Sequence, residues 1–93
     1  MQDHHFEWDD AKAESNRRKH GVTFYEARQV FDDPFGIDVF DDDPDEERWQ
    51  HIGMGPAGVL IVVYTLRNVR ARIITAREAN RHEQDTYHRQ ARP

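Results

Sequence analysis

The stretch VLIVVYTL at residues 59–66 restricts the possible folds more than any other part of the chain. Its first six residues form the longest apolar run, and consecutive apolar side chains cover both faces of an extended segment. This pattern is typical of a buried central β-strand. The run is far shorter than the roughly 20 residues that a membrane-spanning helix needs. We therefore expect a sheet built around this strand, and no association with a membrane.

The segments around this strand predict an antiparallel meander. GPAG at 55–58 has the composition of a tight turn, and RNV at 67–69 that of another. The acidic stretch DDDPDEE resembles the connection of a hairpin. Together these signals predict a sheet of three or four strands, with strands at 36–41, 48–54, 59–66 and 70–75.

The first helix is predicted before these strands, after a lead-in or short strand FEWD at 6–9. Asp9 or Asp10 can cap its N-terminus, and Gly21 can end it just after His20. Its most regular stripe is polar rather than apolar, with the spacing i, i+4, i+7 and i+8 that places side chains on one face. The stripe consists of Lys12, Asn16, Lys19 and His20.

Two further helices are predicted from capping-box patterns. TFYE at 23–26 opens a second helix that should end before Pro34, and TARE at 75–78 opens a C-terminal helix that runs to about Gln90. The second helix would bury Phe24, Ala27, Val30 and Phe31. The order predicts an α+β fold: two N-terminal helices, an antiparallel sheet of three or four strands and a C-terminal helix, with the helices on one face.

Composition predicts one globular domain over residues 1–93. That length suffices for one modest core, and 37% of the residues are apolar against 33% charged. The absence of cysteine excludes disulfides and thiolate metal sites. The N-terminus MQDHHFEWDD is too polar and acidic for a signal peptide, so we expect a cytoplasmic protein.

The charges are unevenly distributed along the chain. Residues 32–47 contain nine acidic and no basic residues, whereas the remainder has 13 Lys and Arg against nine acidic residues. The whole chain carries −5, but the part outside the acidic segment carries +4. A solvated acidic loop is one explanation of the segment. The alternative is that a basic face elsewhere meets a polyanion.

Several classes of active site are not expected. None of the six histidines stands in an HxH or HxxxH spacing, so we predict no metal and no cofactor. Ser15 is the only serine and lies inside a predicted helix without a nucleophile elbow. The five glycines are scattered at turns and form no phosphate-binding loop.

The chemistry that remains belongs to His, Lys, Arg, Glu and Tyr side chains. His20 can transfer protons, and Lys19 can balance negative charge. Arg70 and Arg72 alternate with apolar residues along a predicted strand, so both arginines lie on the same side of it. RNA cleavage needs little more, because the 2′-hydroxyl nucleophile belongs to the substrate. Each residue also has a plain structural explanation, such as a favourable position for His20 at a helix C-terminus.

Four stretches of the chain resemble the BrnT family of bacterial toxins. FEWDDAKAESNRRKHGVTFYEARQVFDDP resembles the opening of the family, and VLIVVYT and RIITAREANRHEQDTY follow in the same order, with ERWQHIG before them. The resemblance covers about residues 6–87, and KHGV…F and RIIxAR are its most specific parts. It implies a ribonuclease toxin of a type II toxin–antitoxin pair, with a fold like that of RelE.

The resemblance also implies site residues and a partner. The family's motif positions fall on Lys19, His20, Arg72, Arg77, Glu83 and Tyr87. We expect His20 to transfer protons and the cationic members to bind phosphate. Lys12, Arg70 and Arg81 are further candidates for RNA binding. The expected partner is a DNA-binding antitoxin of the BrnA type, which would neutralise the toxin and alone contact operator DNA.

Two other hypotheses stay open at the level of the sequence. The chain could be a non-catalytic interaction module that binds a DNA-binding partner, because the acidic segment and the small core suit a partner in either case. Direct DNA binding is disfavoured by the net charge of −5 and by the lack of a basic recognition helix.

Overall fold

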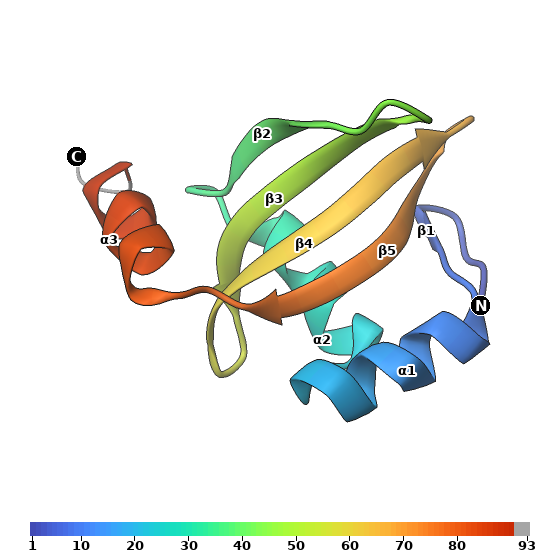
Figure 1. Cartoon of the computed structure of the whole chain (residues 1–93), viewed down its shortest axis with the longest axis horizontal. Coiled ribbons are helices and arrows are strands. Elements are labelled where there is room, and N and C mark those ends of the chain that lie inside the picture. Colours follow the sequence, from blue (N-terminus) through green and yellow to red (C-terminus); the bar gives the residue numbers. More distant parts are fainter. Residues whose placement is uncertain (91–93) are drawn as a thin grey trace.

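The computed structural model describes residues 1–90 as a five-stranded sheet with three α-helices (Figure 1). The mixed α+β class and the C-terminal helix are thus confirmed. The last residues of the predicted domain, 91–93, lie outside the described part. No helix within residues 1–90 has the length and apolar content to cross a membrane. The elements are β1 (Phe6–Glu7), α1 (Asp10–His20), α2 (Phe24–Arg28), the 3-10 helix η1 (Gln29–Asp32), β2 (Ile37–Asp42), β3 (Glu47–Gly55), β4 (Gly58–Arg67), β5 (Arg70–Glu78) and α3 (Arg81–Gln90).

The sheet has one strand more than the sequence predicts. Its order is β1-β5-β4-β3-β2, and the extra strand β1 pairs with β5 in the parallel direction, Phe6 opposite Ala71 and Glu7 opposite Arg72. The sequence offers FEWD at 6–9 as a lead-in or a short strand, and its first two residues form β1. The four strands β2 to β5 form the predicted antiparallel meander.

The start of the C-terminal helix was predicted wrongly. TARE at 75–78 is not a helix cap but the last part of β5, where Thr75 lies opposite Val63 and Arg77 opposite Ile61. The capping box stands five residues later: Asn80 Oδ1 accepts from the N–H of Glu83 at 2.8 Å, and the N–H of Asn80 donates to Glu83 at 2.9 Å. The long partner strand β4 extends the ladder over 75–78, so strand pairing overrides the local pattern.

The predicted second helix is shorter than expected. Thr23 and Glu26 form the predicted capping box, but α2 ends at Arg28 and the chain continues as the tighter helix η1. The side chain of Val30 on η1 is fully buried against the sheet. The change of helix type therefore falls where the chain turns towards the loop that leads into β2.

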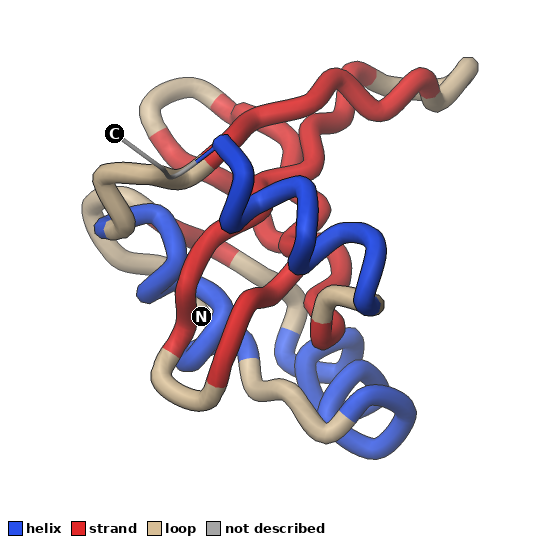
Figure 2. The backbone as a smooth tube through the Cα atoms, turned by 90° about the vertical axis from the view of Figure 1, so that its left-hand side faces the viewer, coloured by secondary structure: helices blue, strands red, loops and turns tan. Residues whose placement is uncertain are grey.

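Both faces of the sheet carry a core, so the prediction that all helices cover one face is wrong. The larger core lies between the sheet and the first two α-helices, and α3 packs on the opposite face (Figures 1 and 2). Strand β4 contributes Leu60 and Val62 to the first core and Val59 and Ile61 to the second. The buried central strand expected from VLIVVYTL is thereby confirmed. The larger core contains Trp8, Val22, Phe24, Ala27, Val30, Leu60, Val62, Ile73 and Ala76.

A buried histidine joins η1 to the sheet. His51 is 6% exposed, its Nδ1 lies 2.8 Å from an Asp38 carboxylate oxygen, and its Nε2 lies 3.0 Å from the carbonyl oxygen of Val30. The ring stacks on Phe31 with 4.5 Å between ring centroids. Tyr64 donates its hydroxyl to the same oxygen of Asp38 at 2.8 Å. This network fixes how closely η1 approaches β3.

Gly53 on β3 tests this close approach. A Cβ at Gly53 would lie 2.8 Å from the carbonyl oxygen of Val30 and 3.0 Å from its Cβ. Because a backbone atom cannot swing aside, we expect Gly53→Ala to lower the free energy of unfolding by about 1–3 kcal/mol. Urea denaturation followed by circular dichroism measures the change. Met54→Ala, at the exposed neighbouring position, should cost less than about 0.5 kcal/mol. Equal stabilities of the two variants would contradict this account.

Candidate active site

Asn16 attaches α1 to the edge of β5. Its side-chain nitrogen donates to the carbonyl oxygens of Ala76 at 2.8 Å and Val22 at 3.0 Å, and its oxygen accepts from the N–H of Ala76 at 3.1 Å. The residue is 7% exposed. On this side of β5 the strand β1 reaches only Ala71 and Arg72. Asn16 therefore bonds both backbone groups of Ala76 in the way that another strand would.

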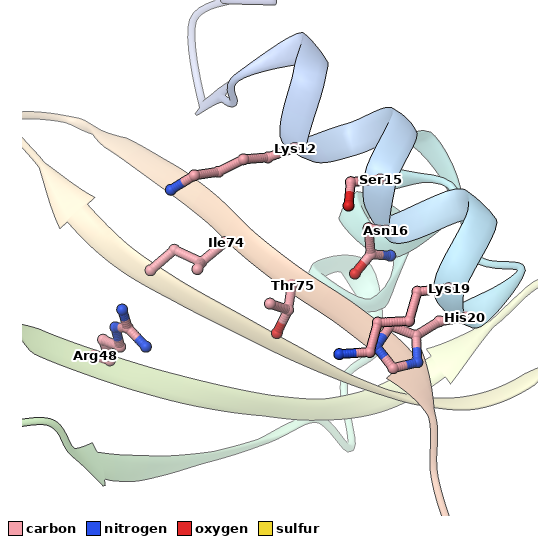
Figure 3. A pocket seen from close by; sticks show the side chains of 8 residues that line it. All are labelled: Lys12, Ser15, Asn16, Lys19, His20, Arg48, Ile74 and Thr75. Carbon is pink, nitrogen blue, oxygen red and sulfur yellow. The ribbon is translucent and has the colours of Figure 1, made fainter.

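This attachment decides which face of α1 lies against the sheet. Lys12, Lys19 and His20 stand four residues before and three and four residues after Asn16, so the four side chains share one face of the helix. Figure 3 shows Lys12, Lys19 and His20 extending from α1 on the side of Asn16. The polar stripe seen in the sequence is thus the side of α1 that is turned towards β5.

A cleft of about 400 Å³ lies between this face of α1 and the sheet. Strand β5 supplies Ile74 and Thr75 to its lining, and β3 supplies Arg48 (Figure 3). Three cationic side chains, an imidazole and two hydroxyls therefore surround one space. The lining consists of Lys12, Ser15, Asn16, Lys19, His20, Arg48, Ile74 and Thr75.

The basic run at residues 17–20 divides between two environments. Glu14 accepts hydrogen bonds from Arg17 and Arg18, and these bonds lower the pKa of Glu14 to about 2. Lys19 and His20 instead line the cleft. Gly21 ends the helix directly after them, in the left-handed conformation with φ of 71°. The last turn of α1 consequently holds His20 in the lining of the cleft.

Arg72 and Arg77 lie on the same face of β5 as Thr75. Arg72 lies opposite Thr65 of β4, Thr75 opposite Val63, and Arg77 opposite Ile61. These β4 residues occupy every second position, so their side chains point to one side of the sheet. A β-bulge at Ile74 keeps Arg72 and Thr75 on one face although the two residues stand three positions apart in the sequence. Arg72 forms an ion pair with Glu7 at 2.8 Å. The two arginines therefore flank the strand residue that lines the cleft.

Arg77, Glu83 and Tyr87 attach α3 to the rest of the fold. Arg77 donates to both carboxylate oxygens of Glu83 at 2.7 and 2.8 Å, which lowers the pKa of Glu83. Tyr87 is buried and donates its hydroxyl to Asp33. Burial, followed by this hydrogen bond, raises the pKa of Tyr87 to about 12. Within residues 1–90 Glu83 and Tyr87 stand outside the lining of the Lys19 and His20 cleft.

The remaining predicted residues have peripheral positions. Arg70 donates to the carbonyl oxygen of Asp3 at 2.6 Å, and Arg81 is exposed at the start of α3.

Sequence reasoning missed Arg48 and Thr75. Arg48 is the first base after the acidic segment, which is a signal, but its place in the cleft depends on sheet register. In the described part of the chain, no three His, Asp or Glu side chains gather where they could hold a metal ion.

The role of Asn16 can be tested with an isosteric change. Asn16→Asp removes the two N–H donors and turns a carboxyl oxygen towards the carbonyl oxygens of Ala76 and Val22. We expect the free energy of unfolding to fall by at least about 2 kcal/mol, measured by urea denaturation. The matched control is Ser15→Ala at the neighbouring exposed position, with an expected change below about 0.5 kcal/mol. A variant as stable as the control would rule out this anchoring role.

The anchoring of α3 predicts an acid sensitivity. The hydrogen bonds from Arg77 lower the pKa of Glu83 below its ordinary value of 4.5. The ionised Glu83 therefore stabilises the folded protein above pH 4.5, and this contribution is lost as the pH falls through the pKa that Glu83 has in the folded state. Glu83→Gln should therefore lose less stability than the wild type between pH 5 and about pH 3. Denaturant titrations across this range measure the difference. The exposed Glu78→Gln serves as control, and a wild-type slope in Glu83→Gln would contradict the assignment.

A comparison with protein families places the chain. The model of a family described as "Ribonuclease toxin, BrnT, of type II toxin-antitoxin system" matches residues 8–83, which include all cleft residues and most of the resembling stretches of the sequence. A search of the curated proteins finds no match. The family match covers most of the 93 residues. The chain therefore belongs to the BrnT family of ribonuclease toxins of type II toxin–antitoxin systems.

Proposed function

We propose that this chain is an endoribonuclease that cleaves RNA without a metal ion, through a 2′,3′-cyclic phosphate. The observation that carries the proposal is the convergence of Lys12, Lys19, His20 and Arg48 on one cleft. Cationic and imidazole side chains suit a reaction in which the nucleophile comes from the substrate and the protein stabilises charge.

The proposed reaction is an intramolecular transesterification. The 2′-oxygen of a ribose attacks the adjacent phosphorus as its proton is removed, and the bond from phosphorus to the 5′-oxygen breaks as that oxygen gains a proton. We assign proton transfer to His20, whose place at the end of α1 is fixed by Gly21 and Asn16. Lys19, beside it in the same lining, stabilises the negative charge that develops on the phosphorane oxygens.

The arginines of β5 extend this cationic surface. Arg72 and Arg77 flank Thr75 on the sheet face that borders the cleft, and we assign them to phosphate binding. Lys12 is assigned to the RNA backbone within the cleft, and Arg70 and Arg81 to the backbone beyond it. Glu83 and Tyr87 then act as positioning residues, because Glu83 orients Arg77 and Tyr87 secures the helix that carries Glu83.

The family also supports a biological role. A type II system pairs the toxin with a protein antitoxin, and membership implies such a partner and an RNA target. We propose that RNA cleavage in the cytoplasm inhibits translation and growth, and that a DNA-binding antitoxin of the BrnA type neutralises the toxin. Operator DNA would be reached only through that antitoxin. We also propose that the fold is of the RelE type.

The proposal is tested by RNA cleavage with the purified chain in excess EDTA. We expect cleavage by the wild type, fragments with 2′,3′-cyclic phosphate ends, and a loss of about 10²-fold or more in rate for His20→Ala. Lys19→Ala and Arg72→Ala should also be slower. Arg18→Ala provides the matched control, because Arg18 carries the same charge as Lys19 and Arg72 but pairs with Glu14 outside the cleft.

Two results would contradict the proposal. Equal rates for His20→Ala and Arg18→Ala would remove His20 from the chemistry. A folded wild type that cleaves neither free RNA nor RNA on translating ribosomes, and whose expression leaves growth unchanged, would favour a non-catalytic interaction module.

A further inference from the structure

Arg48 reaches the cleft from the side opposite α1. It belongs to β3, two residues before Gln50, which pairs with Val63, and Val63 pairs in turn with Thr75. Paired residues lie on one face of a sheet, so Arg48 shares a face with Thr75. Figure 3 shows Arg48 and the α1 lysines on different sides of the space that they line.

Two carboxylates of the acidic turn between β2 and β3 hold Arg48. Its Nε donates to Glu46 at 3.0 Å, and its Nη1 lies 3.3 Å from Asp43. The hydrogen bond to Glu46 raises the pKa of Arg48. The side chains of this group are between 23% and 36% exposed, so water reaches the ion pairs. A guanidinium has five N–H donors, more than two such contacts need, and can bind a phosphate as well.

We propose that Arg48 binds a phosphate group of the RNA, across the cleft from Lys12 and Lys19. The inference rests on the proposed function of the same cleft. Cations on two opposing walls can bind successive negative charges of a strand that passes between them. The ion pairs with Asp43 and Glu46 are only partly buried, so rearranging them towards a phosphate costs little.

The acidic segment then limits where the RNA can lie. Beyond Arg48 the surface carries Asp41, opposite Arg48 on β2, together with Asp43 and Glu46. These carboxylates repel a phosphate backbone. The substrate is thereby confined to the region between α1 and β3, and the acidic loop becomes the boundary of the site.

Binding of a 2′-O-methyl oligoribonucleotide tests the proposal without depending on cleavage, because the probe lacks the nucleophile. Fluorescence anisotropy between 50 and 200 mM salt gives both the affinity and its salt dependence. We expect Arg48→Ala to weaken binding about tenfold and to reduce the slope of log K against log salt by about 0.7, the value for one phosphate contact on a single strand. Arg48→Lys should keep the slope, and Arg18→Ala should match the wild type in both.

The outcomes separate this proposal from the proposed function. If the wild type binds and cleaves RNA while Arg48→Ala and Arg18→Ala share one affinity and one slope, the Arg48 assignment is wrong and the ribonuclease proposal stands. If binding depends on Arg48 but the wild type cleaves no RNA, the Arg48 site stands and the ribonuclease proposal fails. A wild type that does not bind the probe would overturn the phosphate site. Thermal unfolding checks each variant, and Arg48→Gln replaces Arg48→Ala if that variant fails to fold.

Discussion

The pairing of Asn16 with the backbone of Ala76 is the interaction on which the site depends. A helix can lie beside a strand edge in many rotations about its own axis, and only one of them turns Lys12, Lys19 and His20 towards the sheet. Two hydrogen bonds between the buried Asn16 amide and the backbone of Ala76 select that rotation. An amide is suited to this task because it donates and accepts at once, as a strand residue does. Helix α1 has hardly any apolar face. A polar contact therefore fixes its orientation, whereas most helices are oriented by the packing of an apolar face.

The residue that follows Ala76 in β5 makes a contact of a different kind. There the ion pair of Arg77 with Glu83 and the buried hydroxyl of Tyr87 join α3 to the second face of the sheet. The two helices that the strand carries are thus attached independently, one at the edge and one on the face. Thr75 and Arg77 stand only two residues apart, so the cleft and the α3 anchor share a stretch of strand. A rigid β5 is therefore a requirement of both.

Much of the architecture could be predicted because its signals are local. The run VLIVVYTL identifies the central strand, and Asp9 and Gly21 bound the first helix. The predictions failed where two local patterns competed, or where the extent of a strand depends on its pairing partner. TARE and NRHE both fit a capping box, and only the reach of β4 shows which one is used. The same holds for the site. The polar stripe of α1 could be seen in the sequence, because it depends on helical spacing alone. The position of Arg48 in the cleft depends on which strands pair and in which register, and no sequence pattern indicates the bulge at Ile74.

Strand β2 is one of the two edge strands of the sheet, and its outer edge has backbone groups without a neighbouring strand among the described residues. Such an edge invites a second copy of the same strand, which is a common start of aggregation. Here Asp38 and Asp41 belong to the edge strand, and Asp43 and Glu46 follow in the turn. Two such edges brought together would set like charges side by side. The acidic residues that border the cleft therefore also disfavour edge-to-edge pairing of two copies of the sheet.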